Sequence, residues 1–102
     1  MTDIQIFDNA ALHRFELTED EEIAFLLYSR SGNSIRLIHT EVPEALRGRG
    51  VGSTLVGGVL GKAQDQKLTV IPLCPFVVEY LKSHPEFYPI IDPVYLRRIQ
   101  AQ

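Results

Sequence analysis

A glycine-rich loop that contains two arginines is the part of this sequence whose residue types and spacing point most directly to chemistry. The loop residues are Arg47, Gly48, Arg49, Gly50 and Gly52. Apolar residues recur at helical spacing from Val51 onward, so a helix is predicted to begin inside the loop. Glycine lets a ligand approach the backbone, and the first amides of a helix have no internal partner, so the segment predicts an anion site. The helix dipole and the arginine charges favour a phosphate or a diphosphate.

Two familiar phosphate loops do not fit this segment. A Walker-type loop ends in Gly-Lys-Ser or Gly-Lys-Thr, whereas Gly52 is followed by Ser53 and Thr54 without a lysine. The dinucleotide fingerprint needs a third glycine where Ser53 stands, and it needs a parallel strand before the loop. A glycine-rich turn that binds nothing remains the alternative.

The residues before the loop predict antiparallel strands. Ile4 and Ile6 alternate with polar residues, and Phe15 and Leu17 do the same ahead of an acidic turn. Residues 22–42 form two β-rich runs separated by Gly-Asn, which predicts a hairpin that a proline closes.

The residues after the loop change to a helical period. A helix is predicted from Val51 to about Gln66, followed by a short strand in LTVIPL and a second helix in PFVVEYLKSH. The tail after Pro89 has an ambiguous pattern. Tyr95, Leu96 and Ile99 allow a short terminal helix that docks on the rest. The order is therefore several strands, helix, strand, helix.

Composition limits the class of protein. A chain of 102 residues, 45% hydrophobic and 23% charged, suits one globular domain. The chain has no apolar run long enough to cross a bilayer and begins without a signal-like segment, so we expect a cytoplasmic protein. A net charge of −3 argues against nucleic acid as a partner. With Cys74 as the single cysteine, no internal disulfide or multi-cysteine metal site is expected.

The loop also carries a family resemblance. Arg47, Gly50 and Gly52 in the pattern R-x-x-G-x-G resemble the coenzyme A pyrophosphate loop of the GNAT acetyltransferase superfamily. The longer runs HTEVPEALRGRGVG and VIPLCPFVVEYLKSHPEF are similar to its small single-domain members, over residues 12–90. The resemblance implies one α/β domain over residues 1–102, with a mostly antiparallel, splayed sheet flanked by two main helices. It also implies N-acetyl transfer from acetyl-coenzyme A to an amine, by direct attack.

The resemblance implies the following cofactor-binding residues: Thr40, Val42, Arg47, Gly48, Arg49, Gly50, Val51, Gly52, Ser53 and Thr54. The backbone of Val42 takes the place that pairs with the pantetheine arm or points an amide at the thioester oxygen. Pro72 interrupts the strand after the helix. In this fold the strand splays away from its neighbour at that level, although an edge strand would explain the proline equally well.

Three side chains are candidate catalytic groups. Strand alternation places His39 and Glu41 on the face of Leu37, and a histidine pKa near 6.5 suits a base, although a structural histidine fits as well. Tyr80 is similar to the tyrosine that many superfamily members place beside the coenzyme sulfur as proton donor. Cys74 either carries the acyl group transiently, if the following helix lowers its pKa, or lines the pocket.

The acceptor and the oligomeric state stay open. The helices that usually cover the acceptor site in larger relatives are missing, which suits an exposed protein lysine or a small polyamine. A non-catalytic module that senses acyl-coenzyme A is the alternative outside enzymes. The chain is expected to be a monomer or a homodimer without nucleic-acid or membrane partners.

Overall fold

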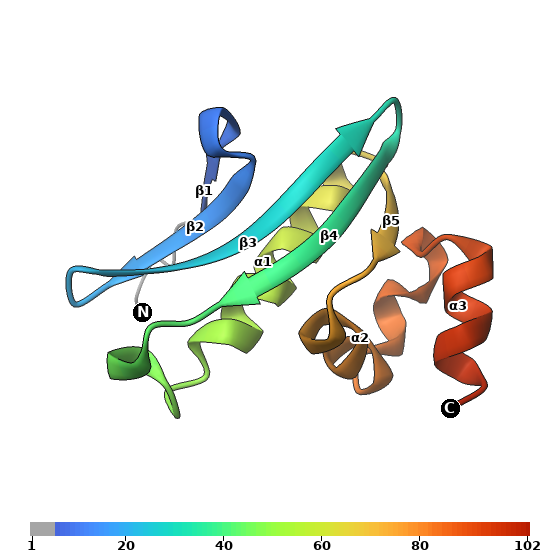
Figure 1. Cartoon of the computed structure of the whole chain (residues 1–102). Coiled ribbons are helices and arrows are strands. Elements are labelled where there is room, and N and C mark those ends of the chain that lie inside the picture. Colours follow the sequence, from blue (N-terminus) through green and yellow to red (C-terminus); the bar gives the residue numbers. More distant parts are fainter. Residues whose placement is uncertain (1–5) are drawn as a thin grey trace.

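A five-stranded sheet organises the computed structural model, which describes residues 6–102 (Figure 1). Its strands are β1 (Ile6–Asn9), β2 (Arg14–Glu19), β3 (Glu22–Ser31), β4 (Ser34–Glu41) and β5 (Thr69–Pro72). They follow one another across the sheet in chain order. β1 to β4 pair antiparallel, and β5 pairs parallel with β4. A parallel pair needs a long crossover connection, which the helix between β4 and β5 supplies.

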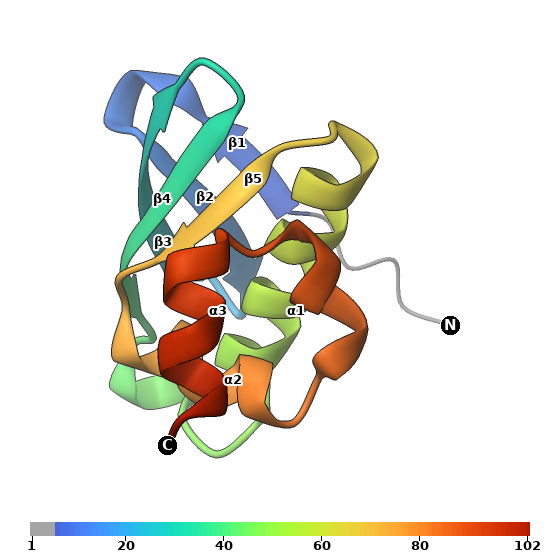
Figure 2. The same ribbon diagram turned by 90° about the vertical axis from the view of Figure 1, so that its right-hand side faces the viewer.

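The helices lie on one side of this sheet. They are α1 (Val51–Asp65), α2 (Pro75–Lys82) and α3 (Pro93–Gln100), and short 3₁₀ turns occupy Ala10–Leu12, Glu44–Leu46 and Pro85–Ile90. Figure 2 shows α1 and α2 against one face of the sheet and α3 beside β5, while the opposite face carries no helix. None of the helices found in residues 6–102 combines the length and the apolarity that a membrane crossing requires.

The core forms between α1 and the inner face of the sheet. Leu26 and Leu37 on the strands and Leu55 and Val59 on α1 are fully buried. Each such side chain contributes about 1.5–3 kcal/mol through its transfer from water. The helical spacing of the apolar residues therefore fixes which face of α1 meets the sheet.

Most predicted elements are confirmed. The hairpin spans Glu22–Ser31 and Ser34–Glu41, and the long helix begins at Val51 as expected. The α/β class with a mostly antiparallel sheet is also confirmed. The tail forms α3, the short terminal helix that Tyr95, Leu96 and Ile99 allowed, and these residues pack against the core beside the two main helices. The predicted strand position Ile4 lies outside the described residues.

A β-bulge at Ile38 changes which side chains of β4 face the core. Leu37 pairs with Tyr28, whereas His39 pairs with Leu27, so Ile38 is an extra residue in the strand. Leu37 is buried, and Ile38 is 42% exposed. Because side chains alternate with a period of two, the extra residue shifts the pattern by one position beyond Leu37.

This shift makes the prediction for the faces of β4 wrong. Alternation alone placed His39 and Glu41 on the face of Leu37, with Thr40 on the other. In the structure Thr40 pairs with the fully buried Leu26 and is part-buried, while His39 and Glu41 are exposed. Thr40 therefore faces the helices, and His39 faces the open side of the sheet.

β4 and β5 separate beyond Leu37. The carbonyl oxygen of Leu37 accepts hydrogen bonds from the amides of Leu73 (2.9 Å) and Cys74 (3.0 Å). Pro72 is the last residue in register with β4, which continues to Glu41 while the other chain turns into α2. Both explanations offered for Pro72 hold, because β5 is an edge strand and also diverges from its neighbour.

Tyr28 anchors β1 to the middle of the sheet. Its ring packs on Phe15 with centroids 4.8 Å apart, and its hydroxyl donates a hydrogen bond to Asp8 Oδ1 at 2.5 Å. Burial, followed by the contact with Asp8, raises the pKa of Tyr28 to about 12.

This raised pKa predicts how alkaline pH affects stability. Unfolded tyrosine loses its proton near pH 10, so between about pH 10 and 12 the folded state holds a proton that the unfolded state has lost. The stabilisation from neutral Tyr28 should be complete below pH 10 and should fall as the pH rises through this window. Tyr28→Phe should lose less stability than the wild type between pH 9 and about 12 in urea unfolding. Parallel pH profiles of the two proteins would contradict the assignment.

Two glycines in α1 should respond oppositely to alanine. A Cβ at Gly61 meets no atom of residues 6–102 within 4 Å, so Gly61→Ala should stabilise the protein by up to about 1 kcal/mol through helix propensity. A Cβ at Gly57 would lie 2.5 Å from the hydroxyl of Tyr80, so Gly57→Ala should destabilise it. Urea unfolding measures both, and an equal gain at the two positions would show that Tyr80 does not pack as described.

Candidate functional site

The glycine loop forms a cradle of free backbone amides. Gly48 (φ 82°) and Gly50 (φ 75°) adopt left-handed conformations that other residues rarely take, and α1 begins directly after them. The first helical bond runs from the amide of Thr54 to the carbonyl of Gly50 at 3.0 Å. The amides of Val51, Gly52 and Ser53 therefore have no carbonyl one turn earlier to bond, and they remain available for an anion.

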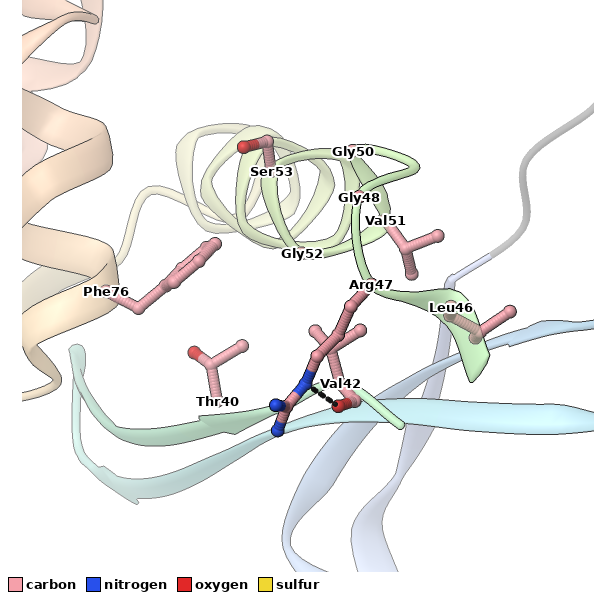
Figure 3. Close-up of a pocket in the computed structure, with 10 residues that line it drawn as sticks. All are labelled: Thr40, Val42, Leu46, Arg47, Gly48, Gly50, Val51, Gly52, Ser53 and Phe76. Carbon is pink, nitrogen blue, oxygen red and sulfur yellow. Dashed lines mark hydrogen bonds between the residues drawn. The ribbon is translucent and has the colours of Figure 1, made fainter. Parts of the chain in front are cut away.

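The cradle opens onto a cavity of about 380 Å³, which we call the cradle cavity. It is lined by Thr40, Val42, Leu46, Arg47, Gly48, Gly50, Val51, Gly52, Ser53 and Phe76. Figure 3 shows these residues arriving from the end of β4, the following turn and loop, the start of α1 and the first turn of α2. The cavity thus begins at the cradle and extends into the space that the divergence of β4 and β5 creates.

Gly52 is required for the width of this cavity. A Cβ at position 52 would lie 2.7 Å from Cζ of Phe76 and 3.3 Å from Cγ2 of Val42. A Cβ at this position would require the Phe76 ring to move, so glycine keeps the space between these two groups open. Phe76 is 43% exposed, although it is a large apolar side chain, so its ring is a wall of the cavity rather than part of the core.

The two arginines of the loop have different surroundings. Arg47 lines the cradle cavity, and its Nε donates to the carbonyl of Val42 at 3.4 Å (Figure 3). Arg49 instead pairs with the acidic turn between β2 and β3, at 2.5 Å from Asp20 and 3.6 Å from Glu19. The hydrogen bond to Asp20 raises the pKa of Arg49 above its ordinary value. The expectation that both arginines face the anion is therefore not met, because carboxylates already neutralise Arg49.

Thr54 also lies away from the cradle cavity. Its hydroxyl donates to the carbonyl of Gly50 at 3.0 Å, and its amide is already used in the helix. With Arg49 it lines a separate hollow of about 110 Å³. The cradle therefore ends at Ser53, one residue earlier than the sequence predicted.

Thr40 and Cys74 meet where the two strands separate. The hydroxyl oxygen of Thr40 lies 3.3 Å from the sulfur of Cys74, and Thr40 lines the cradle cavity. Cys74 is 2% exposed and is not among the lining residues. It precedes Pro75 as the N-terminal cap residue of α2. The pair marks the inner end of the cavity, opposite the cradle.

The comparisons with known proteins agree with this geometry. A sequence model of the family described as GCN5-related N-acetyl-transferase matches residues 14–90. The chain belongs to this family. Protein NATD1 from Homo sapiens and from Mus musculus are each 37% identical to it over 78 residues, which cover 76% of this chain. The same regions make up 64% and 66% of those proteins, so the chain spans just under two thirds of their length.

A solved structure supports the same assignment for the fold. The solution structure of a GCN5-like putative N-acetyltransferase from Staphylococcus aureus superposes with a TM-score of 0.67 at 26% identity. The superposition covers 90% of this chain and 91% of that one. The resemblance of the loop motif to this acetyltransferase family is thereby confirmed.

In this family member Tyr80 lies beside the cradle cavity rather than in it. It lines a groove of about 300 Å³ with His84 and Glu79, and this groove shares Ser53 and Phe76 with the cradle cavity. The ring stacks on His84 at 3.8 Å, and His84 Nδ1 donates to the carbonyl of Tyr80 at 2.8 Å. Burial, and then the charge of Glu86, raises the pKa of Tyr80, so the phenol keeps its proton at neutral pH.

His39 forms a pair of its own on the open face of the sheet. Its Nε2 lies 3.0 Å from Glu41 Oε1, and about half of each side chain is exposed. Neither residue lines the cradle cavity. The predicted base is therefore separated from the predicted proton donor by the thickness of the sheet. Within residues 6–102 no group of three or more His, Cys, Asp or Glu side chains is placed to hold a metal ion.

Sequence reasoning missed Phe76 and Leu46 as lining residues. Leu46 is buried in the 3₁₀ turn before the loop, and Phe76 is an exposed aromatic next to Pro75. The one available signal was the position of Phe76 in the first turn of a helix that follows the splayed strand. That position becomes informative only once α2 is known to face α1.

The unequal environments of the arginines predict unequal effects on coenzyme A binding. Arg47→Gln should weaken binding by about tenfold or more, because it removes a charge-assisted contact at the cavity. Arg49→Gln should weaken it by less than about fivefold, since its charge already serves an exposed ion pair. Isothermal calorimetry measures both, and the two variants are matched controls for net charge. Equal losses would show that Arg49 leaves its carboxylates for the ligand.

Proposed function

We propose that this protein is an acetyl-coenzyme A-dependent N-acetyltransferase that transfers the acetyl group directly to an amine. Members of its family generally use acetyl-coenzyme A, and the cradle fits the diphosphate of that cosubstrate. The observation that carries the proposal is the continuity of one cavity, from the free amides of Val51, Gly52 and Ser53 to Thr40. A ligand with an anion at one end and a long thin arm matches this shape.

Charged groups and the shape of the cavity would each contribute to coenzyme A binding. The three amides and Arg47 would hold the diphosphate, and the absence of a side chain at Gly52 leaves room beside them. The pantetheine arm would follow the end of β4, where the backbone of Val42 offers polar groups beyond the last β5 pairing. The cosubstrate supplies an activated acyl group as a thioester.

The chemical step needs little from the protein beyond positioning. The amine nitrogen attacks the thioester carbon, a C–N bond forms and the C–S bond breaks. The nitrogen gives up one proton, and the sulfur leaves as a thiol after taking one. The amine proton passes to solvent, because the predicted base His39 lies with Glu41 on the opposite face of the sheet. Tyr80 is the candidate for donating the proton to the sulfur, because its raised pKa keeps the phenol protonated.

Burial of Cys74 favours direct transfer over an acyl-cysteine route. Its sulfur is nearly inaccessible and contacts the hydroxyl of Thr40 instead of open cavity. An acyl group on that sulfur would need space that the packing around it does not offer. The same contact makes Cys74 part of the wall that supports Thr40.

Replacement of Cys74 separates the two routes. Cys74→Ala should retain most of the wild-type kcat/KM, because the amine attacks the thioester carbon without a covalent relay. Formation of free coenzyme A would be followed by chromatography, with polyamines, amino acids and lysine peptides as acceptors. Arg47→Glu is the control that should abolish binding. Loss of turnover in Cys74→Ala together with an acetylated wild-type protein by mass spectrometry would establish the covalent route.

The same assay tests whether the protein is an enzyme at all. Turnover with any acceptor of the panel supports the proposal. Tight acetyl-coenzyme A binding without release of free coenzyme A across the whole panel would contradict it, and would favour a module that senses acyl-coenzyme A.

A further inference from the structure

A further hollow lies apart from the cradle cavity, beside α3. It occupies about 240 Å³ between the end of β5, α2 and α3, and it shares no lining residue with the cradle cavity. Figure 1 shows α3 beside β5 and α2 at this corner of the molecule. We call it the Arg98 hollow, after the charged residue in its wall.

The Arg98 hollow combines an apolar floor with a single positive charge. Leu73, Val78 and Ile99 supply apolar surface, and Gln102 and Tyr95 supply polar groups. Among residues 6–102, no acidic side chain lines it. Its volume corresponds to about eight waters at roughly 30 Å³ each, which suits a small polar molecule or one end of a larger one.

The guanidinium of Arg98 packs over an aromatic ring and forms no ion pair with a carboxylate of residues 6–102. Its guanidinium carbon lies 5.0 Å from the centroid of the Tyr95 ring, a cation–π arrangement that leaves the N–H edges open. Within residues 6–102 no ion pair involves Arg98, whereas Arg14 and Arg49 each pair with carboxylates. An oriented, unneutralised guanidinium in a concave wall is suited to bidentate binding of a carboxylate.

The Leu73–Cys74 corner lies between the hollow and the end of the cradle cavity at Thr40. Leu73 lines the hollow and is 45% exposed, and the next residue is Cys74, whose sulfur meets Thr40. The amides of Leu73 and Cys74 bond the same carbonyl of Leu37, so this corner is fixed to β4. A molecule seated in the hollow would therefore lie next to the point at which β4 and β5 part.

We propose that the Arg98 hollow binds the carboxylate of the amine acceptor, so that the acceptor is an amine that also carries a carboxylate. This inference rests on the proposed acetyltransferase function and narrows its substrate class. Arg98 anchors the carboxylate, the apolar floor takes the carbon chain, and the amine points past Leu73 toward the thioester. A polyamine without a carboxylate offers no group that the Arg98 guanidinium can bind.

Matched acceptors test this substrate class. Lysine and cadaverine differ only in the carboxylate, and ornithine and putrescine form a second such pair. The wild type should show a kcat/KM at least about tenfold higher for the amino acid of each pair. Arg98→Gln should abolish this preference through a higher KM with kcat largely kept. Arg98→Lys should restore part of it, because it keeps the charge without the planar fork.

Arg97 provides the control on the same helix. It is exposed, adjacent in sequence and outside the hollow, so Arg97→Gln removes the same charge without changing the lining. It should leave the preference for amino acids intact. Peptides with a free or an amidated C-terminus separate a free amino acid from a peptide terminus as the source of the carboxylate. Either source supports the proposal, provided that the free carboxylate is required.

Two outcomes would overturn the inference while leaving the acetyltransferase function standing. One is faster turnover of polyamines than of amino acids, and the other is an Arg98→Gln variant with an unchanged ratio. A binding readout covers the case in which no acceptor turns over. Titration of lysine into the ¹⁵N-labelled protein should shift the Nε–H resonance of Arg98 and saturate, and the shift should be absent with cadaverine. An unmoved resonance contradicts the proposal, and coenzyme A calorimetry reports separately on the cradle.

Discussion

The carbonyl oxygen of Leu37 is the last point that joins β4 and β5, and the geometry of the site depends on that junction. It accepts the amides of both Leu73 and Cys74, so the two strands are fixed together up to this residue and part directly beyond it. The parting leaves the end of β4 without a neighbour on that side. The cradle cavity occupies the space between this free end, α1 and α2. A continuous ladder would have closed it.

An ion pair with the turn between β2 and β3 determines which of the two loop arginines faces the cradle cavity. The turn between β2 and β3 places Asp20 and Glu21 in left-handed conformations and carries carboxylates to Arg49. That exposed pair links the loop to the turn between β2 and β3. Arg47 is left to face the cavity with the free amides at the start of α1. Arg49 thus contacts the acidic turn, and Arg47 supplies the arginine charge beside the cradle cavity.

The sequence was sufficient for features that depend on local pattern. Glycine spacing and the onset of helical period at Val51 located the cradle, and the Gly-Asn turn located the hairpin. Features set by tertiary pairing could not be predicted this way. One extra residue at Ile38 reversed the faces expected for His39 and Thr40. The alternation of side chains along a strand assumes a regular strand, and nothing in the sequence here indicates a bulge. The partner of Arg49 lies 29 residues away in the chain, and no local pattern reports such a contact.

The structure bears on the proposed transfer through what its candidate catalytic groups lack. Cys74 is buried, Tyr80 holds its proton, and His39 is solvated and paired with Glu41 on the other side of the sheet. None of them is an activated nucleophile at the thioester. What the fold does provide is two concave surfaces with the Leu73–Cys74 corner between them. In the proposed reaction, holding an amine and a thioester at one corner would convert an encounter of two molecules into a local step, and such a gain can supply a large part of a rate enhancement.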